Sequence, residues 1–530
     1  MDVSEDRRAK RQRFQEAGEA AYGADPGFEG RRTVADLLAA EDPDAEPAAV
    51  LALAGRLTAL RDHGNSLFLD LRDATGRIQV FVQKKAVGPE RFALFRDNLD
   101  LGDFLAATGE FRRTKKGEPT LFASGLRLLT KSMKAPPKEH FGLADVEARL
   151  RERHVDLAAN RDSYRRFVDR SRIVSALRTM LERQDFMEVE TPMLHAVAGG
   201  AAARPFITHH NKLDLDLYLR IAPELFLKRL LVGGYERVYE IGRSFRNEGL
   251  SPRHNPEFTM LEAYWAYARA EQWMQFTELM IRTLARESAV RGGPAGAGGE
   301  AGGDDSAADA TREAGGTDGG EVGVLHWNGH VIDTGPAFAR ASYGELVQRH
   351  AGVDLHDEAA VTAACRQHGI DTAGLSPAKL VDELFGACVE PHLVQPTYVV
   401  DFPIEHSPLA KSRPDDPRLA ERFELFMGCM EVANGFSELN DPDDHLARFE
   451  GQVAARDPEL PAQVDHDYVD ALRYGMPPAA GIGIGIDRLV MLLTGSPTIR
   501  DVILFPLLRP LDRSGERGGE LPAAPTAGDA

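Results

Sequence analysis

The chain of 530 residues is long enough for two or more domains, each with its own core. Its formal net charge of -19 argues against a protein that coats nucleic acid non-specifically, since that affinity comes mainly from Lys and Arg, and leaves only a local basic face for such a partner. Three cysteines are too few for a disulfide framework and no apolar run suits a membrane span or signal peptide, so we expect a cytoplasmic protein without membrane contact.

The first part of the chain predicts a charged extension and then a small β unit. Residues 1–47 form the charged extension. Residues 48–150 contain apolar runs of period two, such as 66–71 and 77–82, with turn residues between them, which indicates a unit of the size of an OB-fold barrel. Basic residues cluster in the same region, at 84–85 and within 112–116 and 131–138. Phe68 beside them favours single-stranded nucleic acid, which proteins hold by stacking on aromatic rings and by neutralising the phosphate backbone. A structural barrel with a solvated charged face is the alternative.

A helix and a short strand are predicted next. Residues 162–184 carry apolar side chains at helical spacing, which predicts an amphipathic helix that faces the core. Residues 186–192 read as a strand that ends at a proline, and proline belongs at a strand end or a sheet edge because it cannot donate to the ladder. This edge is a candidate dimer contact.

Two segments have the composition of disordered chain. Residues 291–320 hold eleven glycines and seven alanines and no large apolar side chain, so they cannot bury enough surface to offset the loss of chain entropy. We therefore predict a disordered insertion at about 288–322. Residues 513–530 are also rich in Gly, Ala and Pro and predict a flexible tail.

Two arginines far apart in the sequence indicate a polyphosphate site. Arg246 follows a strand-like run, and Arg488 follows glycines that alternate with isoleucines, a pattern that reads as a strand leading into a helix. Guanidinium groups match phosphate oxygens two at a time, so this pair could hold both ends of a nucleoside triphosphate. Because neither a Rossmann fingerprint nor a GxxxxGK[ST] loop is present, we expect the site on an antiparallel sheet.

Three acids spaced seven residues apart form a second cluster, namely Glu424, Glu431 and Glu438. Any one of them alone would be read as a solvated surface residue. The residues around Asn434 alternate as in a strand, so Asn434, Phe436 and Glu438 share one face, and Glu431 points to the other unless a bulge intervenes. Carboxylates near a triphosphate suit Mg²⁺, and a further carboxylate could hold a substrate cation.

Taken together, these stretches resemble a class II lysyl-tRNA synthetase from about residue 52 to residue 510. Three stretches are similar to the class II motifs, the first of which lies at the dimer interface: 186–192, 245–248 and 483–488. Three others are similar to the lysine enzyme in particular: 199–206, 253–258 and 434–440. The resemblance implies an α+β fold, with an N-terminal OB-fold β-barrel at 48–150. A class II catalytic domain would follow at 151–512, on a mixed, mainly antiparallel β-sheet flanked by helices.

The resemblance also implies roles for single residues. Arg246, Glu248 and Arg488 would be catalytic, with Arg246 bridging the α-phosphate and the lysine carboxylate and Arg488 holding the γ-phosphate. The ATP site would comprise Arg246, Glu248, His254, Asn255, Phe258, Glu424 and Arg488, with adenine between Phe258 and Arg488. The lysine site would comprise Gly200, Glu224, Arg246, Tyr264, Asn434, Phe436 and Glu438. The Mg²⁺ ligands would be Glu424 and Glu431, and the anticodon would be bound by Phe68, Gln79 and Glu118.

The implied reaction has two steps in a homodimer. L-lysine and ATP would give lysyl-adenylate and pyrophosphate, with Mg²⁺ as cofactor, and the lysyl group would then pass to the 3′ end of tRNA(Lys). An aspartyl- or asparaginyl-tRNA synthetase is one alternative, although Glu438 would repel an acidic substrate. A lysine ligase that acts on a protein and a paralogue that only binds RNA are the others.

Overall fold

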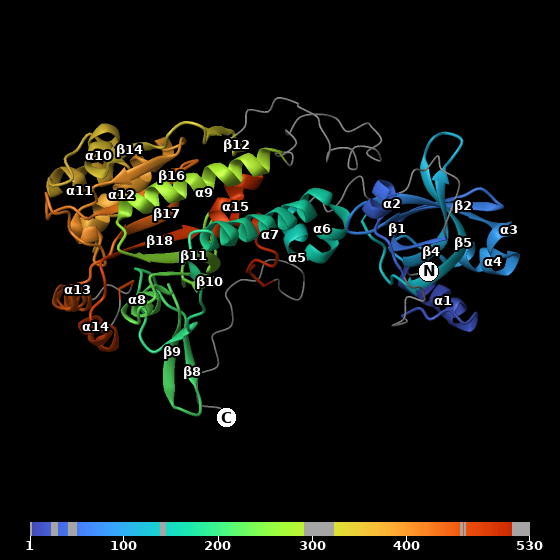
Figure 1. The fold of residues 1–530 in the computed structure, drawn as a ribbon, viewed down its shortest axis with the longest axis horizontal. Coiled ribbons are helices and arrows are strands. Elements are labelled where there is room, and N and C mark those ends of the chain that lie inside the picture. Colours follow the sequence, from blue (N-terminus) through green and yellow to red (C-terminus); the bar gives the residue numbers. More distant parts are fainter. Residues whose placement is uncertain are drawn as a thin grey trace. The chain divides into compact units, whose positions relative to one another are not determined.

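The computed structural model describes residues 3–22, 30–40, 50–137, 145–290, 323–455, 459–460 and 463–510. The described chain forms two compact units, which divide between Asn160 and Arg161 (Figure 1). Helix α9 continues to Val290, so the first three residues of the predicted insertion at about 288–322 are helical. The remainder of that segment and the predicted tail at 513–530 lie outside the described residues.

The first unit is a closed five-stranded barrel with the strand order β1-β2-β3-β5-β4. Its strands are β1 Leu51–Asp62, β2 Ser66–Arg72, β3 Arg77–Gln83, β4 Phe104–Arg113 and β5 Pro119–Thr130. Leu67, Leu69 and Leu71 of β2 are fully buried, whereas Phe68 between them is only half-buried, so alternate residues face the core and the surface. The predicted OB-fold barrel is confirmed.

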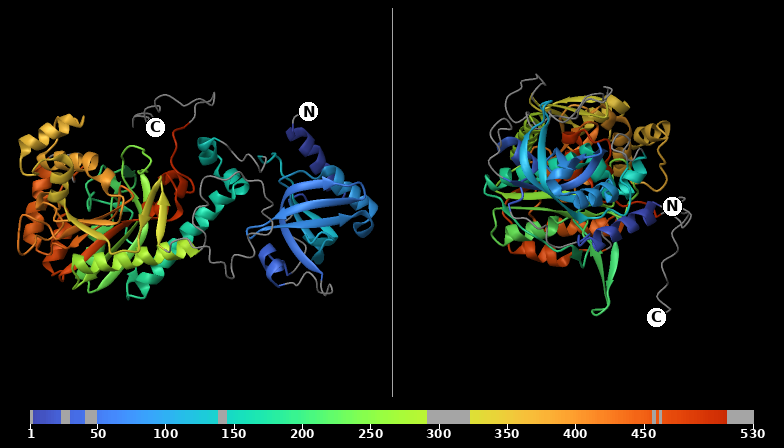
Figure 2. Two further views of the ribbon diagram at one scale, coloured as in Figure 1. Left: turned by 90° about the horizontal axis from the view of Figure 1, so that it is seen from above. Right: turned by 90° about the vertical axis from the view of Figure 1, so that its right-hand side faces the viewer.

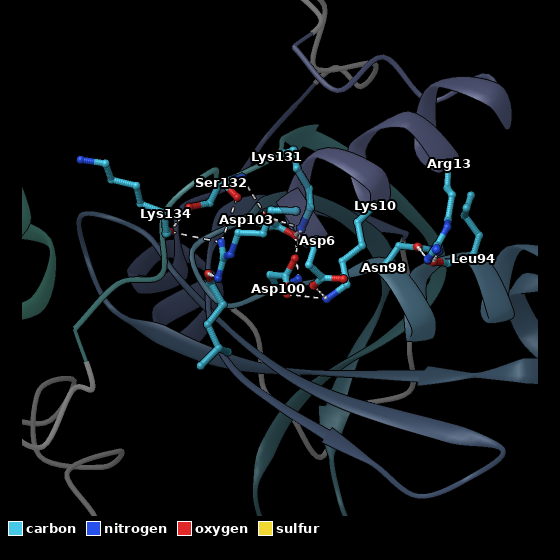
Figure 3. A network of polar contacts seen from close by, with 12 residues as sticks. Asp6, Lys10, Arg13, Leu94, Asn98, Asp100, Asp103, Lys131, Ser132 and Lys134 are labelled. Atoms are coloured by element: carbon cyan, nitrogen blue, oxygen red, sulfur yellow. Dashed lines mark hydrogen bonds and ion pairs between the residues drawn. The ribbon is translucent and has the colours of Figure 1, made fainter. Parts of the chain in front are cut away.

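Part of the charged extension folds against the barrel. The helices of this unit are α1 Val3–Glu16, α2 Val34–Ala40, α3 Lys84–Val87, α4 Pro89–Asn98, α5 Val146–Arg151 and α6 Arg153–Ala159. Phe14 of α1 packs on Phe95 of α4 with ring centroids 5.2 Å apart. Asp100 binds both Lys10 of α1, at 2.9 Å, and the buried Lys131, at 2.5 Å (Figure 3). These contacts fix α1 on the barrel.

The second unit is built on an eight-stranded sheet with the order β14-β15-β16-β17-β18-β11-β10-β6. The strands are β6 Met187–Glu188, β10 Arg237–Phe245, β11 Glu257–Ala266, β14 Ala339–Ser342, β15 Thr397–Val400, β16 Arg422–Met427, β17 Met430–Ser437 and β18 Ala479–Gly485. Only β6 with β10 and β14 with β15 run parallel. The sheet is therefore mixed and mainly antiparallel, as predicted.

Three helices pack on this sheet and carry its core (Figures 1 and 2). They are α7 Arg161–Glu182, α9 Ala270–Val290 and α15 Ile486–Thr494. Leu177 of α7, Trp273 of α9 and Leu489 of α15 are buried in one apolar cluster with the strands. The helix predicted at 162–184 is confirmed. In the predicted strand at 186–192, only Met187–Glu188 pairs, and it does so at the edge of the sheet.

Smaller elements complete the second unit. The strands β7 Leu194–His195, β8 Ile207–His210 and β9 Leu215–Leu219 form one sheet, and β12 Val324–Trp327 pairs with β13 His330–Asp333. The helices are α8 Glu224–Val232, α10 Tyr343–Ala351, α11 Glu358–Gln367, α12 Pro377–Cys388, α13 Pro442–Ala455, α14 His466–Arg473 and α16 Ile499–Val502. Within the described part of the chain, no helix has both the length and the apolar character needed to cross a membrane.

Candidate active site

An open cavity brings together most of the predicted site residues in the second unit. Its walls come from β11, β17, β18, the first turn of α15 and the loop between β10 and β11. The predicted residues that line it are Gly200, Glu224, Arg246, Glu248, His254, Asn255, Phe258, Tyr264, Glu431, Asn434, Phe436 and Arg488. Glu424 and Glu438 are not among the lining residues.

Arg246 stands at the end of β10, where the hairpin with β11 opens into a loop. Its backbone N–H donates to the Pro256 carbonyl at 2.9 Å, which fixes the start of the loop. The side chain is half-buried, and its Nε has no hydrogen-bond partner in the described chain, nor does any described carboxylate form an ion pair with it. Its guanidinium lies 5.2 Å from the centroid of the Phe258 ring. Burial lowers the pKa of Arg246, opposed by the charges of Glu431 and Glu248, and since no described carboxylate pairs with it directly, the site favours an anionic ligand.

Arg488 lies in the first turn of α15, directly after β18, as the sequence predicted. It donates from Nη1 to the backbone carbonyl of Glu431 at 2.8 Å and to Oε2 of the same residue at 3.1 Å. Its Nη2 lies 3.0 Å from Nε2 of His254. Partial burial and the Arg488 charge lower the pKa of His254, so this ring is neutral near pH 7. These contacts hold Arg488 at the cavity wall.

Asp487 connects the first turn of α15 to two other elements. Its Oδ1 accepts from Nη1 of Arg170 on α7 at 2.6 Å, and its Oδ2 accepts from the Thr259 backbone N–H on β11 at 2.7 Å. Asp487 is 2 % exposed, so these bonds are shielded from water. No local pattern pointed to Arg170, which lies 317 residues before its partner.

A β-bulge decides where Glu431 points. Leu425 pairs with Ala433 and Phe426 pairs with Glu431, so Val432 is an extra residue on β17. Glu431 therefore lines the same cavity as Asn434 and Phe436. The sequence left open whether Glu431 points to the face of Asn434 or to the opposite face. In the structure it points to the face of Asn434, which requires the bulge.

Glu424, the other predicted Mg²⁺ ligand, lies on β16 opposite Asn434. It forms an ion pair with Arg422. Burial, opposed by Arg422 and reinforced by Glu431, raises the pKa of Glu424 to about 8. A second cation near Glu424 and Glu431 would therefore be favoured by the local charge.

The far end of the cavity is acidic. Glu438 is 1 % exposed, the Lys228 ammonium lies 2.5 Å from its Oε2, and its Oε1 has no hydrogen-bond donor in the described chain. A Cβ on Gly481, which lines the cavity, would stand 2.3 Å from Oε1 of Glu438 and 2.5 Å from Cε1 of Tyr264. Glycine at this position leaves the carboxylate and the ring next to the cavity. Burial raises the pKa of Glu438 to about 8.

Glu262 also lines this end of the cavity, and the sequence analysis missed it. It is 6 % exposed and accepts a hydrogen bond from the Tyr264 hydroxyl at 3.3 Å. Burial and the neighbouring Glu224 raise the pKa of Glu262 to about 8. The period of two along β11, which puts Glu262 on the face of Tyr264, was the signal that could have identified it.

The surface of the barrel presents a row of aromatic rings from three neighbouring strands. Phe68 of β2 lies 4.7 Å from Phe81 of β3, which lies 5.3 Å from Phe122 of β5. The guanidinium of Arg112 stacks on Phe122 at 3.9 Å. All three rings are half-buried. The sequence analysis named Phe68 alone, because the parallel pairing of β3 with β5 that adds Phe122 joins residues about 40 positions apart.

The two other predicted anticodon residues lie together on the barrel. Gln79 and Glu118 both line a small cavity, to which Asp70 and Arg77 also contribute. Oε1 of Gln79 accepts a hydrogen bond from the Thr120 hydroxyl at 3.1 Å. Gln79 and Phe81 are two positions apart on β3 and so share one face of the strand. The cavity and the aromatic row therefore belong to one surface.

Comparisons with known proteins agree with both units. Residues 145–509 match the family model of class II tRNA synthetases (D, K and N), and residues 51–129 match the OB-fold nucleic acid binding domain. A lysine–tRNA ligase of Moorella thermoacetica is 44% identical over 96% of this chain and 98% of the relative. A lysine–tRNA ligase of Dehalococcoides mccartyi is 44% identical over 93% of this chain and 94% of the relative. One of Xanthomonas oryzae is 47% identical over 88% of this chain and 88% of the relative. The chain belongs to the lysine–tRNA ligase family.

Membership of the lysine–tRNA ligase family narrows the alternatives from the sequence. The matching family model covers the D, K and N branches together, whereas the relatives named above are all lysine–tRNA ligases. An aspartyl- or asparaginyl-tRNA synthetase and a protein-modifying ligase are therefore not favoured.

Proposed function

We propose that this enzyme activates L-lysine with ATP to lysyl-adenylate and transfers the lysyl group to the 3′ end of tRNA(Lys). The observation that carries this function is the opposite charge of the two ends of one cavity. At one end Arg246 has no anionic partner in the described chain, and at the other end Glu224, Glu262 and Glu438 are buried. A triphosphate suits the first end and a diamino acid suits the second.

The phosphate end supports in-line attack by the lysine carboxylate on the α-phosphorus of ATP. Arg246 would contact both the carboxylate and the α-phosphate, and Arg488 would hold the γ-phosphate, with Glu248, His254 and Asn255 completing the ATP contacts. Such preorganised charges act mainly by positioning the reactants and by offsetting the charge that develops in the transition state. Phe258 offers an aromatic face for the adenine base.

The acidic end supports recognition of both ammonium groups of lysine. Glu224, beside Gly200, would take the α-ammonium, and Glu438 with Tyr264 the ε-ammonium. Asn434 and Phe436 line the space between, where the apolar stem of lysine would lie. Glu262 adds a third carboxylate, so the pocket favours a cation over a neutral or acidic side chain.

Glu424 and Glu431 would hold Mg²⁺ together with phosphate oxygens. Carboxylate oxygens are the ligands that Mg²⁺ prefers, and it usually takes one or two of them beside the phosphates of a substrate. The raised pKa of Glu424, caused by burial and by Glu431, fits a place that a cation would stabilise. Bound Mg²⁺ would neutralise phosphate charge.

The barrel would bind the anticodon of tRNA(Lys). Phe68 would stack on a base, and Gln79 and Glu118 would contact base edges from the small cavity beside it. Arg112 adds positive charge at the end of the same row.

Two further expectations concern assembly and location. We propose a homodimer, which large exposed apolar side chains near β6 to β9 support: Met187, Met193, Leu194, Ile207 and Leu213. Sedimentation velocity would test it, and a purely monomeric enzyme would contradict it. We place the enzyme in the cytoplasm because it acts on tRNA in translation.

The decisive experiment measures exchange of labelled pyrophosphate into ATP with lysine, aspartate or asparagine as the only amino acid. We expect exchange with lysine alone, and label from lysine on tRNA when tRNA is added. Exchange driven by aspartate or asparagine would refute lysine as the substrate, and labelled lysine attached to protein would refute tRNA as the acceptor.

A further inference from the structure

Lys228 joins the two carboxylates to which we assign the ammonium groups of the substrate. It lies on α8, one helical turn after Glu224, and its side chain is fully buried. Its Nζ is 2.5 Å from Oε1 of Glu224 and 2.5 Å from Oε2 of Glu438. Neither the motifs of the sequence nor the reaction described above uses this residue.

The contact occupies one oxygen of each carboxylate. Oε1 of Glu438 has no donor in the described chain and lies next to Gly481 at the cavity. The bond from Lys228 to Glu224 likewise uses Oε1 alone. A single buried ammonium thus fixes the separation and the orientation of both carboxylates and leaves an oxygen of Glu438 for a ligand.

From this geometry, and resting on the proposed function, we infer that Lys228 is a positioning residue that sets the length of the diamino acid the pocket accepts. The distance between the α- and ε-ammonium groups of lysine depends on four methylenes, and a shorter chain cannot reach both carboxylates at once. Binding energy then depends on how rigidly the two acids are held.

The surrounding charges explain why Lys228 itself stays charged. Besides Glu224 on its own helix and Glu438 after β17, its charge acts on His445 of α13 and Tyr468 of α14, while Glu262 and Tyr264 of β11 face the two carboxylates. Despite burial, which lowers it, the pKa of Lys228 is raised by Glu224 and Glu438. Burial lowers the pKa of His445 to about 3 and raises that of both tyrosines, so these three side chains are neutral at pH 7. One ammonium therefore pairs with two carboxylates, those of Glu224 and Glu438.

Loss of the ammonium would have two consequences. The pKa values of Glu224 and Glu438, already raised by burial, would rise further, so the acids would stay protonated to a higher pH and would bind ammonium groups more weakly. The two acids would also be free to move relative to each other, so the pocket would no longer select for length.

A role limited to stabilising the fold is the alternative, and kinetics separate the two roles. In Lys228→Met, we expect the KM for lysine in pyrophosphate exchange to rise about tenfold or more, because that is the usual effect of losing one charged hydrogen bond. The KM for ATP should change little. The preference for lysine over ornithine, which is one methylene shorter, should fall, and the acid limb of kcat/KM for lysine should move to higher pH. Arg229→Met, one residue along α8, is the matched control, because Arg229 stacks on Phe226 and contacts neither acid.

A second variant keeps the test valid if Lys228→Met does not fold. Lys228→Arg retains the charge with a longer side chain, so it should fold and yet lose part of the preference for lysine over ornithine. Unchanged lysine KM, selectivity and pH profile in a folded variant would overturn the role of Lys228 while leaving the proposed function intact. Wild-type enzyme without lysine-dependent exchange would instead overturn the proposed function.

Discussion

Gly481 and Glu438 approach each other so closely that no side chain fits between them. A Cβ at position 481 would lie 2.3 Å from Oε1 of Glu438, whereas real Cβ atoms keep more than 3 Å from such neighbours. Gly481 pairs with Phe436 on β17 and with Tyr264 on β11, so the backbone on both sides is fixed by the sheet. The space next to this glycine is therefore held open by the backbone of β11, β17 and β18.

The first prediction concerns this space. Gly481→Ala should raise the KM for lysine in pyrophosphate exchange by about a hundredfold or abolish exchange, because the methyl group displaces the Glu438 carboxylate or occupies the place of the ε-ammonium. Gly451→Ala is the control, since a Cβ at position 451 in α13 meets nothing within 4 Å. Normal lysine KM in a folded Gly481→Ala enzyme would contradict the placement of lysine here.

The second prediction concerns Arg246. Arg246→Ala should reduce adenylate formation by about ten- to a hundredfold or more, since each charged hydrogen bond to a phosphate contributes roughly 1.5 to 3 kcal/mol. The fold should remain, because no described carboxylate forms an ion pair with Arg246. Circular dichroism and exchange kinetics check this, with the exposed Arg286→Ala as the control. Near-normal exchange would refute the role.

The third prediction follows from the buried acids. The pKa values of Glu262 and Glu438 are raised to about 8, above those of the unfolded chain, so between about pH 4.3 and 8 the native state binds more protons than the unfolded state. Stability of the lysine-free enzyme should accordingly fall as pH rises through this window. Lysine needs ionised carboxylates, so a fixed lysine concentration should raise Tm more at about pH 8.5 than at about pH 6.5. An equal shift at both pH values would contradict this assignment, and Glu262→Gln should reduce the difference.

The fourth prediction concerns the barrel. Phe68→Ala and Phe122→Ala should each raise the KM for tRNA by about five- to a hundredfold, since stacking on a base contributes roughly 1 to 3 kcal/mol. Neither should change lysine-dependent exchange without tRNA. Phe104→Ala serves as the control, because Phe104 lies on β4 under Arg56 and outside the row. If the KM for tRNA is unchanged in both variants, the aromatic row does not bind tRNA.

The fifth prediction concerns the support of Arg488. Arg170→Met removes the 2.6 Å bond to Asp487 and should lower kcat for exchange with less effect on the lysine KM, since the first turn of α15 carries Arg488 at the phosphate end. Arg172→Met on the exposed side of α7 is the control. A change confined to the lysine KM would argue against this role.

Much of the site could be predicted where local patterns were strong. The alternation of glycine and isoleucine before Arg488 predicted β18 and α15, and the runs on either side of Arg246 predicted β10 and β11. In each case the regular spacing of apolar residues along the segment decides which side chains face the core.

Other features had no local signal. The orientation of Glu431 depends on one unpaired residue in β17, which the alternation of the sequence could not reveal. The partners of Glu424 and Glu438 are Arg422 and Lys228, and the second of these lies on a different element.

The sequence by itself determined the barrel at the start of the chain, the helix at 162–184, the strands around Arg246 and before Arg488, and the choice of these two arginines as site residues. Hydrophobic period and motif spacing are local properties, so they can be read without coordinates. Only the tertiary structure decided that Glu224 and Glu438 share the ammonium of Lys228, that Glu262 lies at the same end of the cavity, and that Gly481 leaves room beside Glu438. Ion pairing, desolvation and free volume depend on distances across strands and helices, which spacing along the chain does not specify.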